Sequence, residues 1–562
     1  MRMKNSVNLA FLILLSCFGG IGFCFRLPQD EVDALKQVAK TLGRPDWNFT
    51  VDPCDEKRFP WTKQNPVKGS ESYVNCNCSS TVCHVIRIGF KSQNLQGTLP
   101  PELFRLPHLG EIDLTRNFLN GTIPPQWASL PLVIISLLGN RLTGPIPKEF
   151  GNITTLKTLT LEANWLSGPF PPELGNLINL QKVQIGSNAF TGTLPKAFAK
   201  LKNLLDFRVS QTSLSGQIPD FIGSWTLLQR LEIQGTNMVG PIPSTLSSLT
   251  NLTDIRISDM NGSTNVFPDL NQMVNMKNLI LRNCNISGEL PDFLAQMTNL
   301  KVLDLSFNRL TGEIPKSFES LAKTKFIYLT NNSLSGTVPD WMLKNGKNID
   351  LSFNNFTWLY TASTSCQQGK VNLLGSSYMT NSNSREVVPC LTSSPCHDKN
   401  YHLYINCGGE KEKINCTTYV QDNDPGTATR YFESSDGGNW AFSSTGNFMD
   451  NDLDNDIYTI TNKTTLYMPD AELYMQARIS PTSLTYYGLC LGKGNYNVSL
   501  LFAEIIITND DSFSSLGKRI FDVYIQVNSQ NMFILIHELD DFSIYNVFSV
   551  GQTCSEGFQY QR

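Results

Sequence analysis

The feature that most constrains the fold of this chain is a repeat with a period of 24 residues. Segments such as "IDLTRNFLNGTIPPQW" and "LDLSFNRLTGEIPKSF" share the frame LxLxxNxLxGxIP. A unit of this length cannot bury its own apolar face, so successive units must stack side by side. The N position recurs every 24 residues, except for one interval of 23 and a final one of 22, at Gln93, Asn117, Asn140, Asn164, Asn188, Thr212, Thr236, Met260, Cys284, Asn308, Asn332 and Asn354.

The letters of the frame have a physical reading. LxL is a short strand with its leucines directed into the stack, and the Asn amide can pair with backbone groups of neighbouring turns that would otherwise be buried unpaired. Thr212 and Thr236 can replace it in part and Cys284 weakly, whereas Met260 cannot. The unit of Met260 also lacks the Gly and shifts its Pro to 268, so we expect an irregular ladder there. We assign 85–358 to an α/β leucine-rich-repeat solenoid of about 12 repeats.

The first residues have the composition of a targeting segment. Arg2 and Lys4 precede the apolar run "VNLAFLILLSCFGGIGF", which predicts a secretory signal peptide over 1–24. Nothing later approaches about 18 consecutive apolar residues, so we predict no membrane span in this chain. The charged fraction is 17% and no basic tract is present, which argues against nucleic acid as a partner. We expect a protein secreted into an oxidising extracellular space.

Residues 25–84 are expected to cap the N-terminal end of the stack. "LPQDEVDALKQVAKTLG" places Val32, Leu35 and Leu42 on one helical face that ends at Gly43. Cysteines follow, and a zinc site is the weaker alternative to disulfides in a secreted chain. The pairing stays open. The disulfide candidates of the whole chain are Cys54, Cys76, Cys78, Cys83, Cys366, Cys390, Cys396, Cys407 and Cys490.

Twelve Asn-x-Ser/Thr sequons follow the signal peptide and predict a glycoprotein. They are Asn48, Asn77, Asn120, Asn152, Asn251, Asn261, Asn285, Asn331, Asn355, Asn415, Asn462 and Asn497.

The outward positions of the repeat strands supply a candidate binding surface. In the middle units these positions gather polar and charged side chains, and a glycan on Asn331 would obstruct the C-terminal third. One interpretation is a solvated ladder of alternating charge, in which each pair contributes under about 1 kcal/mol. The other is a docking strip for a peptide or partner, with Arg as a carboxylate fork. The candidate contacts are Arg208, Gln211, Glu232, Gln234, Arg256, Asp259 and Arg282.

A second domain follows a cap and linker at 359–402. Short alternating strands with Gly, Asn and Asp turns indicate an all-β sandwich over 403–527. Its segments "LYINCGGE", "TTYVQD", "GGNWAFSSTGNFMD", "LTYYGLCLGKGNYNVSLLFAEI" and "GKRIFDVYIQ" resemble the malectin-like domain of plant leucine-rich-repeat receptor-like kinases. The resemblance covers about 1–526 and implies a cell-surface receptor ectodomain. Because animal malectin binds sugars through aromatic side chains, Tyr419, Tyr431, Trp440 and Phe442 are candidates for sugar stacking, with core packing as the alternative.

Two shorter motifs do not support chemistry. "DNDLDNDIYTIT" at 450–461 begins like a calcium loop, but Asn455 replaces the turn Gly and Thr461 the bidentate Glu. "GKGNYNV" at 492–498 imitates a kinase glycine loop without the catalytic motifs of a kinase. We therefore predict no catalytic residues, no metal, no cofactor and no enzymatic activity.

The tail at 528–562 does not resemble the family, and we expect the sandwich to be truncated after 527. A retained intron read from Val527 is our hypothesis for this change, and Cys554 in the tail is a candidate partner of Cys416. The predicted function is the ligand-recognition region of a receptor-like kinase, binding an apoplastic peptide, a glycan or a co-receptor ectodomain, without the kinase and so unable to signal alone. The alternatives are a secreted inhibitor of cell-wall hydrolases, a non-functional splice product and a carbohydrate-active enzyme.

Overall fold

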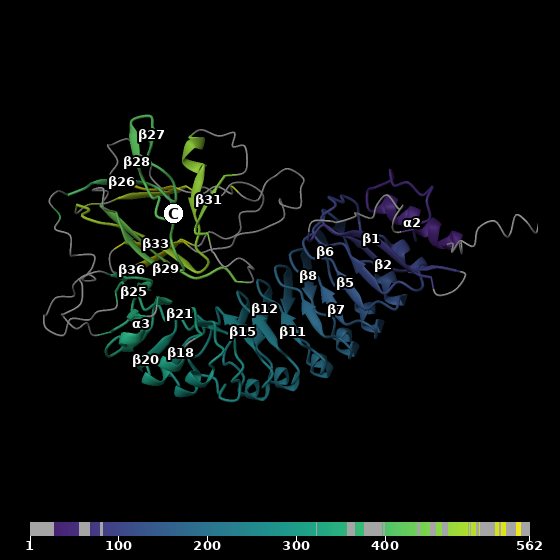
Figure 1. Cartoon of the computed structure of the whole chain (residues 1–562), viewed down its shortest axis with the longest axis horizontal. Helices are drawn as coiled ribbons and strands as arrows, with labels where there is room; N and C mark the ends of the chain where they lie inside the picture. The colour runs from purple at the N-terminus through teal and green to yellow at the C-terminus, as the bar shows by residue number, and fades with distance from the viewer. Residues whose placement is uncertain are drawn as a thin grey trace, which may run out of the picture.

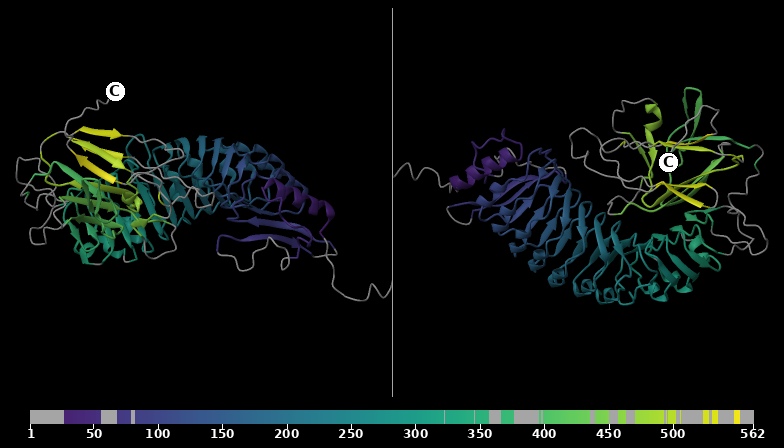
Figure 2. Two further views of the ribbon diagram at one scale, coloured as in Figure 1. Left: turned by 90° about the horizontal axis from the view of Figure 1, so that it is seen from above. Right: turned by 180° about the vertical axis from the view of Figure 1, so that it is seen from behind.

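A long arch of stacked repeats carries a second, sheet-rich body over its C-terminal end (Figures 1 and 2). The computed structural model describes residues 27–55, 68–78, 82–321, 323–344, 346–356, 366–375, 396, 399–434, 439–449, 457–462, 470–492, 494, 496–501, 505, 523–527, 530–534 and 547–551. The signal peptide predicted at 1–24 and the interrupted calcium-like loop at 450–456 lie outside these residues.

The N-terminal end of the arch is covered as the sequence predicts. Helix α2 (Gln29–Thr41) buries Ala34, Leu35 and Val38 against the first repeats. It ends before Gly43, whose φ of 82° lies in the left-handed region that favours glycine. The antiparallel strands β1 (Ser72–Asn77) and β2 (His84–Phe90) complete the cap and join it to the repeat sheet.

The inner face of the arch is one continuous sheet whose repeat strands are parallel and in register. Each repeat gives it one strand because the LxL segment recurs at the same place in each unit. In order, the strands after β2 are β3 (Glu111–Asp113), β5 (Ile134–Ser136), β7 (Thr158–Thr160), β9 (Lys182–Gln184), β11 (Asp206–Arg208), β13 (Arg230–Ile233), β15 (Asp254–Ser258), β17 (Asn278–Arg282), β19 (Val302–Asp304), β21 (Phe326–Tyr328), β23 (Asn348–Asp350), β25 (Val371–Asn372) and β24 (Gln367–Gln368).

Two smaller parallel sheets line the opposite side of the repeats. The first runs through β4 (Asn120–Gly121), β6 (Arg141–Gly144), β8 (Trp165–Pro169), β10 (Ala189–Gly192), β12 (Ser213–Gln217) and β14 (Asn237–Val239). The second contains β16 (Asn265–Val266), β18 (Ile286–Glu289), β20 (Arg309–Glu313) and β22 (Ser333–Ser335). The break between them falls in the unit of Met260, where only the isolated bridge Val239–Asn261 connects the strands. The irregularity predicted for this unit is confirmed.

Short helices close the outer side of most repeats. The apolar residue that each buries toward the stack, such as Phe150 or Leu246, joins the same continuous core as the strand leucines. All ten of the helices begin directly after a proline, whose fixed φ suits the extended backbone before the first turn. They are η1 (Pro101–Arg105), η2 (Pro125–Ser129), η3 (Lys148–Asn152), η4 (Pro172–Asn176), η5 (Lys196–Lys200), η6 (Asp220–Ser224), η7 (Ser244–Ser248), η8 (Asp292–Gln296), η9 (Lys316–Ser320) and α3 (Asp340–Lys344).

The asparagine ladder satisfies the backbone as predicted. Asn308 Oδ1 accepts hydrogen bonds from the amides of Cys284 and Ile286 at 3.0 and 3.1 Å, and its Nδ2 donates to the Leu281 and Leu305 carbonyls at 2.7 and 2.9 Å. The Thr212 hydroxyl donates one such bond, to the Val209 carbonyl at 2.9 Å. The Cys284 thiol makes only long contacts to carbonyl oxygens, at 3.3 and 3.4 Å.

The second body is built from antiparallel and mixed sheets. Its strands and its 3₁₀ helix are β26 (His402–Asn406), β27 (Glu412–Ile414), β28 (Thr417–Gln421), β29 (Thr429–Glu433), β30 (Trp440–Thr445), β31 (Thr459–Thr461), η11 (Ala471–Tyr474), β32 (Gln476–Arg478), β33 (Ser483–Gly488), β34 (Asn497–Leu501), β35 (Val523–Val527), β36 (Gln530–Ile534) and β37 (Val547–Gly551). Strand β37 lies between β26 and β34 in a five-stranded sheet. A segment of the tail expected to fall outside the domain therefore supplies a strand to it.

Candidate ligand-binding site on the inner sheet

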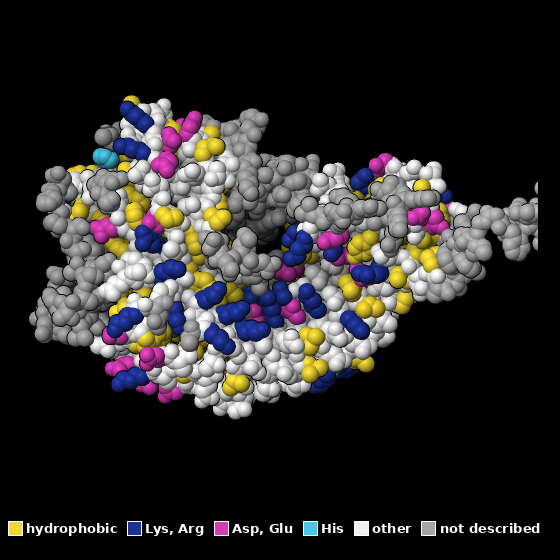
Figure 3. Space-filling model, viewed as in Figure 1, with side chains coloured by type: hydrophobic (Ala, Val, Ile, Leu, Met, Phe, Trp, Pro, Cys, Tyr) yellow, Lys and Arg dark blue, Asp and Glu magenta, His cyan; other side chains and the backbone are white. Residues whose placement is uncertain are grey.

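The inner sheet of the arch divides into a covered part and a polar part. From β17 onward the second body rests on it, and before β17 the outward positions carry alternating charges. In Figure 3, Lys and Arg side chains gather along the inner margin of the arch. The extent of the covered part determines how much of the polar part remains available.

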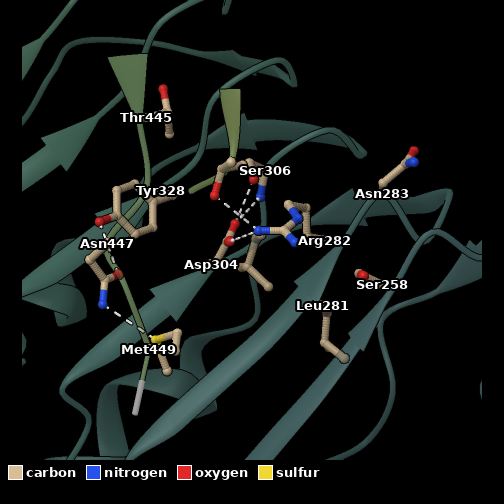
Figure 4. Close-up of polar contacts among 12 residues, drawn as sticks. Ser258, Leu281, Arg282, Asn283, Asp304, Ser306, Tyr328, Thr445, Asn447 and Met449 are labelled. Atoms are coloured by element: carbon tan, nitrogen blue, oxygen red, sulfur yellow. Dashed lines mark hydrogen bonds and ion pairs between the residues drawn. The ribbon is translucent and has the colours of Figure 1, made fainter. Parts of the chain in front are cut away.

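Apolar side chains mark the beginning of the covered part. Ile280, Val302 and Tyr328 form a buried cluster on β17, β19 and β21, and Met449 of the second body packs against it. Beside this cluster the Tyr328 hydroxyl lies 3.1 Å from Asn447 Oδ1 (Figure 4). The strands from β3 to β15 carry polar residues at the position of Ile280 and Tyr328, so these two side chains are a local adaptation to the second body.

The contact is continued by polar groups of the last repeats. The Thr445 hydroxyl donates to Asp350 Oδ2 at 2.6 Å, and Asn372 Nδ2 donates to the Ser443 hydroxyl at 2.9 Å. All four residues are buried. Burial raises the pKa of Asp350, and the hydrogen bonds that it accepts, first from Ser352 and then from Thr445, oppose that rise. Buried and mutually satisfied polar groups of this kind fix one arrangement of two surfaces.

Arg282 belongs to this contact and not to an open binding surface. Its Nη1 lies 3.3 Å from Asp304 Oδ2 and donates to the hydroxyl of Thr482, on the second body, at 3.0 Å (Figure 4). Asp304 in turn accepts bonds from the amide and hydroxyl of Ser306. The structure thus corrects the expectation of Arg282 as a ligand contact, because its guanidinium joins the two bodies.

In the polar part, Arg and Asp or Glu alternate both along and across the strands. Arg208 pairs with Asp206 at 2.7 and 2.8 Å, and Arg230 pairs with Glu232 at 2.8 Å. The register sets Arg208 beside Glu232 and Glu232 beside Arg256. This alternation agrees with the interpretation of a self-paired charge ladder, because each of these guanidinium groups already forms an ion pair with a carboxylate.

Arg256 is withdrawn from the surface by this pairing. It is 4% exposed and holds Asp254 through two bonds of 2.9 Å. Asp259 accepts bonds from the Ser258 hydroxyl and from Asn283 Nδ2. The remaining predicted residues are more accessible: Gln211 is exposed, and Arg208, Glu232 and Gln234 are half-buried. We call these four residues together with Glu162 the polar strip.

Glu162 is the member of the polar strip that the sequence analysis missed. It is half-buried two residues after β7, and within the described residues its carboxylate forms no hydrogen bond or ion pair. Burial, followed by the charge of Glu232, raises its pKa above the ordinary value. The neighbouring unit has Gly186 at the same position, where a Cβ would meet the Ser210 carbonyl oxygen at 2.7 Å, so no side chain follows Glu162 in the column. The glycine at this repeat position, directly after the unit of Glu162, is the sequence feature that could have identified Glu162.

The candidate sugar-stacking aromatics belong mainly to the core of the second body. Trp440 and Phe442 are 1% and 0% exposed and stack on one another, and Tyr431 is also buried. Tyr419 is half-buried and contacts Tyr404 edge-on. The stacking hypothesis is therefore corrected for the first three side chains, because neighbouring side chains already cover their ring faces.

The predicted cysteines are mostly disulfide-bonded. Cys54 pairs with Cys76, Cys78 with Cys83, and Cys396 with Cys490, and Cys366 is also oxidised. Cys390 and Cys554 lie outside the described residues. Cys407 is a buried thiol, which corrects its assignment as a disulfide candidate, and Cys416 is an exposed thiol.

The sequons are accessible. Asn285 and Asn462 are half-buried, whereas the other ten asparagines are exposed. Glycosylation itself stays a prediction.

Comparison with known proteins places this architecture in a class. A family model described as a malectin domain matches residues 401–555, and leucine-rich-repeat models match 155–177 and 274–334. The malectin match extends past 527, the position at which we expected the resemblance to end. The chain thus combines leucine-rich repeats with a malectin domain.

The curated relatives specify the class further. A probable leucine-rich-repeat receptor-like serine/threonine-protein kinase of Arabidopsis thaliana is 51% identical over 527 residues, which cover 92% of this chain and 51% of the relative. A second probable kinase of this type from the same plant is 52% identical over 531 residues, covering 92% and 52%. This chain is a leucine-rich-repeat and malectin protein that is similar to these plant receptor-like kinases over 92% of its own length, and it spans about half the length of the curated relatives that it matches.

Solved structures resemble the arch less closely. The HAESA leucine-rich-repeat ectodomain of Arabidopsis, in complex with an extended IDA peptide hormone, is 29% identical, with 50% of this chain and 47% of that chain covered and a TM-score of 0.45. The PEPR1–AtPEP1 complex is 25% identical, with 58% and 48% covered and a TM-score of 0.46. Within the described residues, no helix has the length and apolarity needed to span a bilayer.

Proposed function

We propose that this chain is the extracellular ligand-recognition region of a plant receptor-like kinase, and that it binds an apoplastic peptide, glycan or co-receptor ectodomain on the polar strip. The relatives support the receptor part of the proposal, since they are named as receptor-like serine/threonine kinases and their alignments cover 92% of this chain. Recognition of this kind breaks no covalent bond. A signal would require the kinase that the relatives' names state.

The observation that carries the proposal is the division of the inner sheet. The malectin domain occupies the sheet from β17 onward, with its own hydrogen bonds and apolar contacts. The polar strip lies before this boundary, with β15 between them, and retains a half-buried carboxylate, Glu162, that is not paired among the described residues. A concave sheet beside a domain junction, with a few convergent polar groups, has the properties of a binding site.

A ligand search with the whole secreted chain tests the proposal. The immobilised chain is incubated with the low-molecular-weight fraction and, separately, with the protein fraction of extracellular plant fluid. Bound compounds and proteins are identified by mass spectrometry, and the synthetic compound or the purified ectodomain is titrated calorimetrically. The double variant Arg208→Gln/Gln211→Ala should weaken its Kd about tenfold or more, because it removes two side chains at the centre of the strip.

The matched control is Arg309→Gln/Gln217→Ala. Both of its residues are exposed and lie on the smaller sheets of the opposite side, on β20 and β12. Equal loss of affinity in both variants would contradict the proposed location. Failure to recover any peptide, oligosaccharide or ectodomain that binds would contradict the function.

A further inference from the structure

Three lysines occupy the same repeat position in consecutive units. Lys277, Lys301 and Lys325 each come directly before a strand of the inner sheet, namely β17, β19 and β21. Their backbones are neighbours, since the Lys301 amide donates to the Lys277 carbonyl at 2.7 Å and the Lys325 amide to the Lys301 carbonyl at 2.8 Å. We call these three residues the lysine row.

The lysine row lies on the surface. All three residues are exposed. Adjacent strands are about 4.8 Å apart, so the row places positive charges at a short and regular spacing along one margin of the arch. The ammonium groups of Lys277 and Lys301 have no hydrogen-bond or ion-pair partner among the described residues. Exposed like charges at this separation repel each other modestly, so the pairing of charges within the fold does not account for Lys277 and Lys301.

Two acids on the adjacent strands β15 and β19 are engaged elsewhere. Asp254 holds Arg256 and accepts a bond from Asn278 Nδ2, and Asp304 accepts bonds from Ser306 and Arg282. The next unit behaves differently, since Lys347 is half-buried and donates to the Leu321 carbonyl at 2.6 Å. The row therefore ends after Lys325, and these acids do not neutralise Lys277 or Lys301.

The same position is not basic by default. Among the earlier units from β7 onward, one has Lys157 there and the next four have Gln181, Leu205, Gln229 and Thr253. The backbone of each of these residues is hydrogen-bonded to the same position of a neighbouring unit. The repeat frame thus accepts a neutral residue at this position. The run of lysines begins at the unit where the malectin domain also begins to cover the sheet, so a ligand on the row would lie along the junction of the two domains.

We propose that the lysine row is a binding site for a linear acidic polysaccharide, with one carboxylate for each sugar unit along the stretch that it contacts. A single exposed ion pair contributes under about 1 kcal/mol, so a lone carboxylate would bind very weakly, whereas a polymer engages several lysines at once. A stiff polymer with regularly spaced charges matches a row whose spacing is set by a rigid sheet. An acidic peptide presents its carboxylates on flexible side chains and loses more conformational entropy on binding.

This site is separate from the polar strip, and its ligand does not depend on the proposed receptor function. The formal net charge of the chain is −4, so general attraction of the whole protein for a polyanion does not explain such binding. Binding through the row should be sensitive to salt, because exposed charges are screened within about 8 Å at physiological ionic strength.

Binding of polygalacturonate to the full chain tests the proposal. We expect measurable binding at low salt that falls steeply with added salt, and no binding of the fully methyl-esterified polymer. The variant Lys277→Gln/Lys301→Gln/Lys325→Gln should weaken the apparent Kd about tenfold or more. Glutamine is the residue of two other units at this position, so the variant should keep the fold, which its thermal unfolding curve checks.

The matched control is Lys148→Gln/Lys196→Gln/Lys316→Gln. These exposed lysines begin η3, η5 and η9 on the outer side of the arch, and their replacement changes the net charge by the same amount. The control should bind polygalacturonate like the unmodified chain. The proposal is overturned if the two triple variants lose affinity equally, if the full chain does not bind the polymer at low salt, or if it prefers poly-L-glutamate.

Discussion

The Asp350 carboxylate accepts a hydrogen bond of 2.6 Å from the Thr445 hydroxyl, although 95 residues separate the two in the sequence. Asp350 is fully buried in the last repeats, and Thr445 ends strand β30 of the malectin domain. Because an acceptor of this kind is costly to leave unsatisfied in the interior, the pair makes the packing of each domain depend on the other. The arch and the malectin domain are therefore joined by a specific contact.

Replacement of Thr445 should weaken this contact. In Thr445→Val the shape of the side chain is kept, but Asp350 loses one of its donors, and we expect a loss of about 1–3 kcal/mol in the free energy of unfolding of the joined domains. Denaturant titration measures the free energy of unfolding, and hydrogen exchange should show faster opening of β30 and β23. The control is Thr418→Val on β28, whose side chain is exposed. Equal effects of both changes would show that the contact contributes nothing specific.

Titration of Asp350 should make the stability of the chain depend on pH. Burial raises its pKa in the folded state above the ordinary value of 3.8. Its contribution is therefore fully present below pH 3.8 and is lost as the pH rises through the folded-state pKa. The free energy of unfolding, measured from weakly acidic to neutral pH, should fall more steeply with pH in the unmodified chain than in Asp350→Asn. Parallel curves for the two proteins would refute this assignment.

The repeat region could be predicted from the sequence because its physics is local. Each strand, turn and amide of the ladder, such as that of Asn308, contacts the adjacent unit, so a period of 24 residues defines both the element and its neighbour. The unit of Met260 could be predicted for the same reason. It lacks the ladder Asn side chain and its Pro is shifted, and both features predict the break between β14 and β16.

The docking of the malectin domain could not be predicted in this way. Arg282 and Thr482 are 200 residues apart, and no periodicity connects them. From the sequence, Arg282 looked like other outward arginines, and only the contact across the two domains shows its role. Trp440 and Phe442 illustrate the same limit, because an aromatic strand is compatible with both a sugar platform and a core until the opposing sheet is known.

Removal of a single ladder amide should be more harmful than the degenerate units suggest. Asn308→Ala removes the acceptor of the Cys284 and Ile286 amides and one donor each to the Leu281 and Leu305 carbonyls, of which Leu305 keeps a bond from Asn332 Nδ2. We expect a loss of about 3 kcal/mol or more in the free energy of unfolding, mainly from the two buried amides. Thr212→Ala removes one bond and should cost about 1 kcal/mol. Urea unfolding of both variants measures the difference. If the two costs were equal, the ladder would not be the source of stability that its geometry indicates.

The disulfides should contribute unequally because they close loops of different length. Cys396–Cys490 joins residues separated by 94 positions and ties the start of the malectin region to its later strands, whereas Cys78–Cys83 spans 5. Since the entropy removed from the unfolded chain grows with loop length, Cys396→Ala/Cys490→Ala should lower the free energy of unfolding by about 4–5 kcal/mol, and Cys78→Ala/Cys83→Ala by clearly less. Calorimetry of both variants under identical buffer conditions makes the comparison. A larger loss from the short loop would mean that native packing around Cys83, which is fully buried, outweighs the effect of the loop on the unfolded chain.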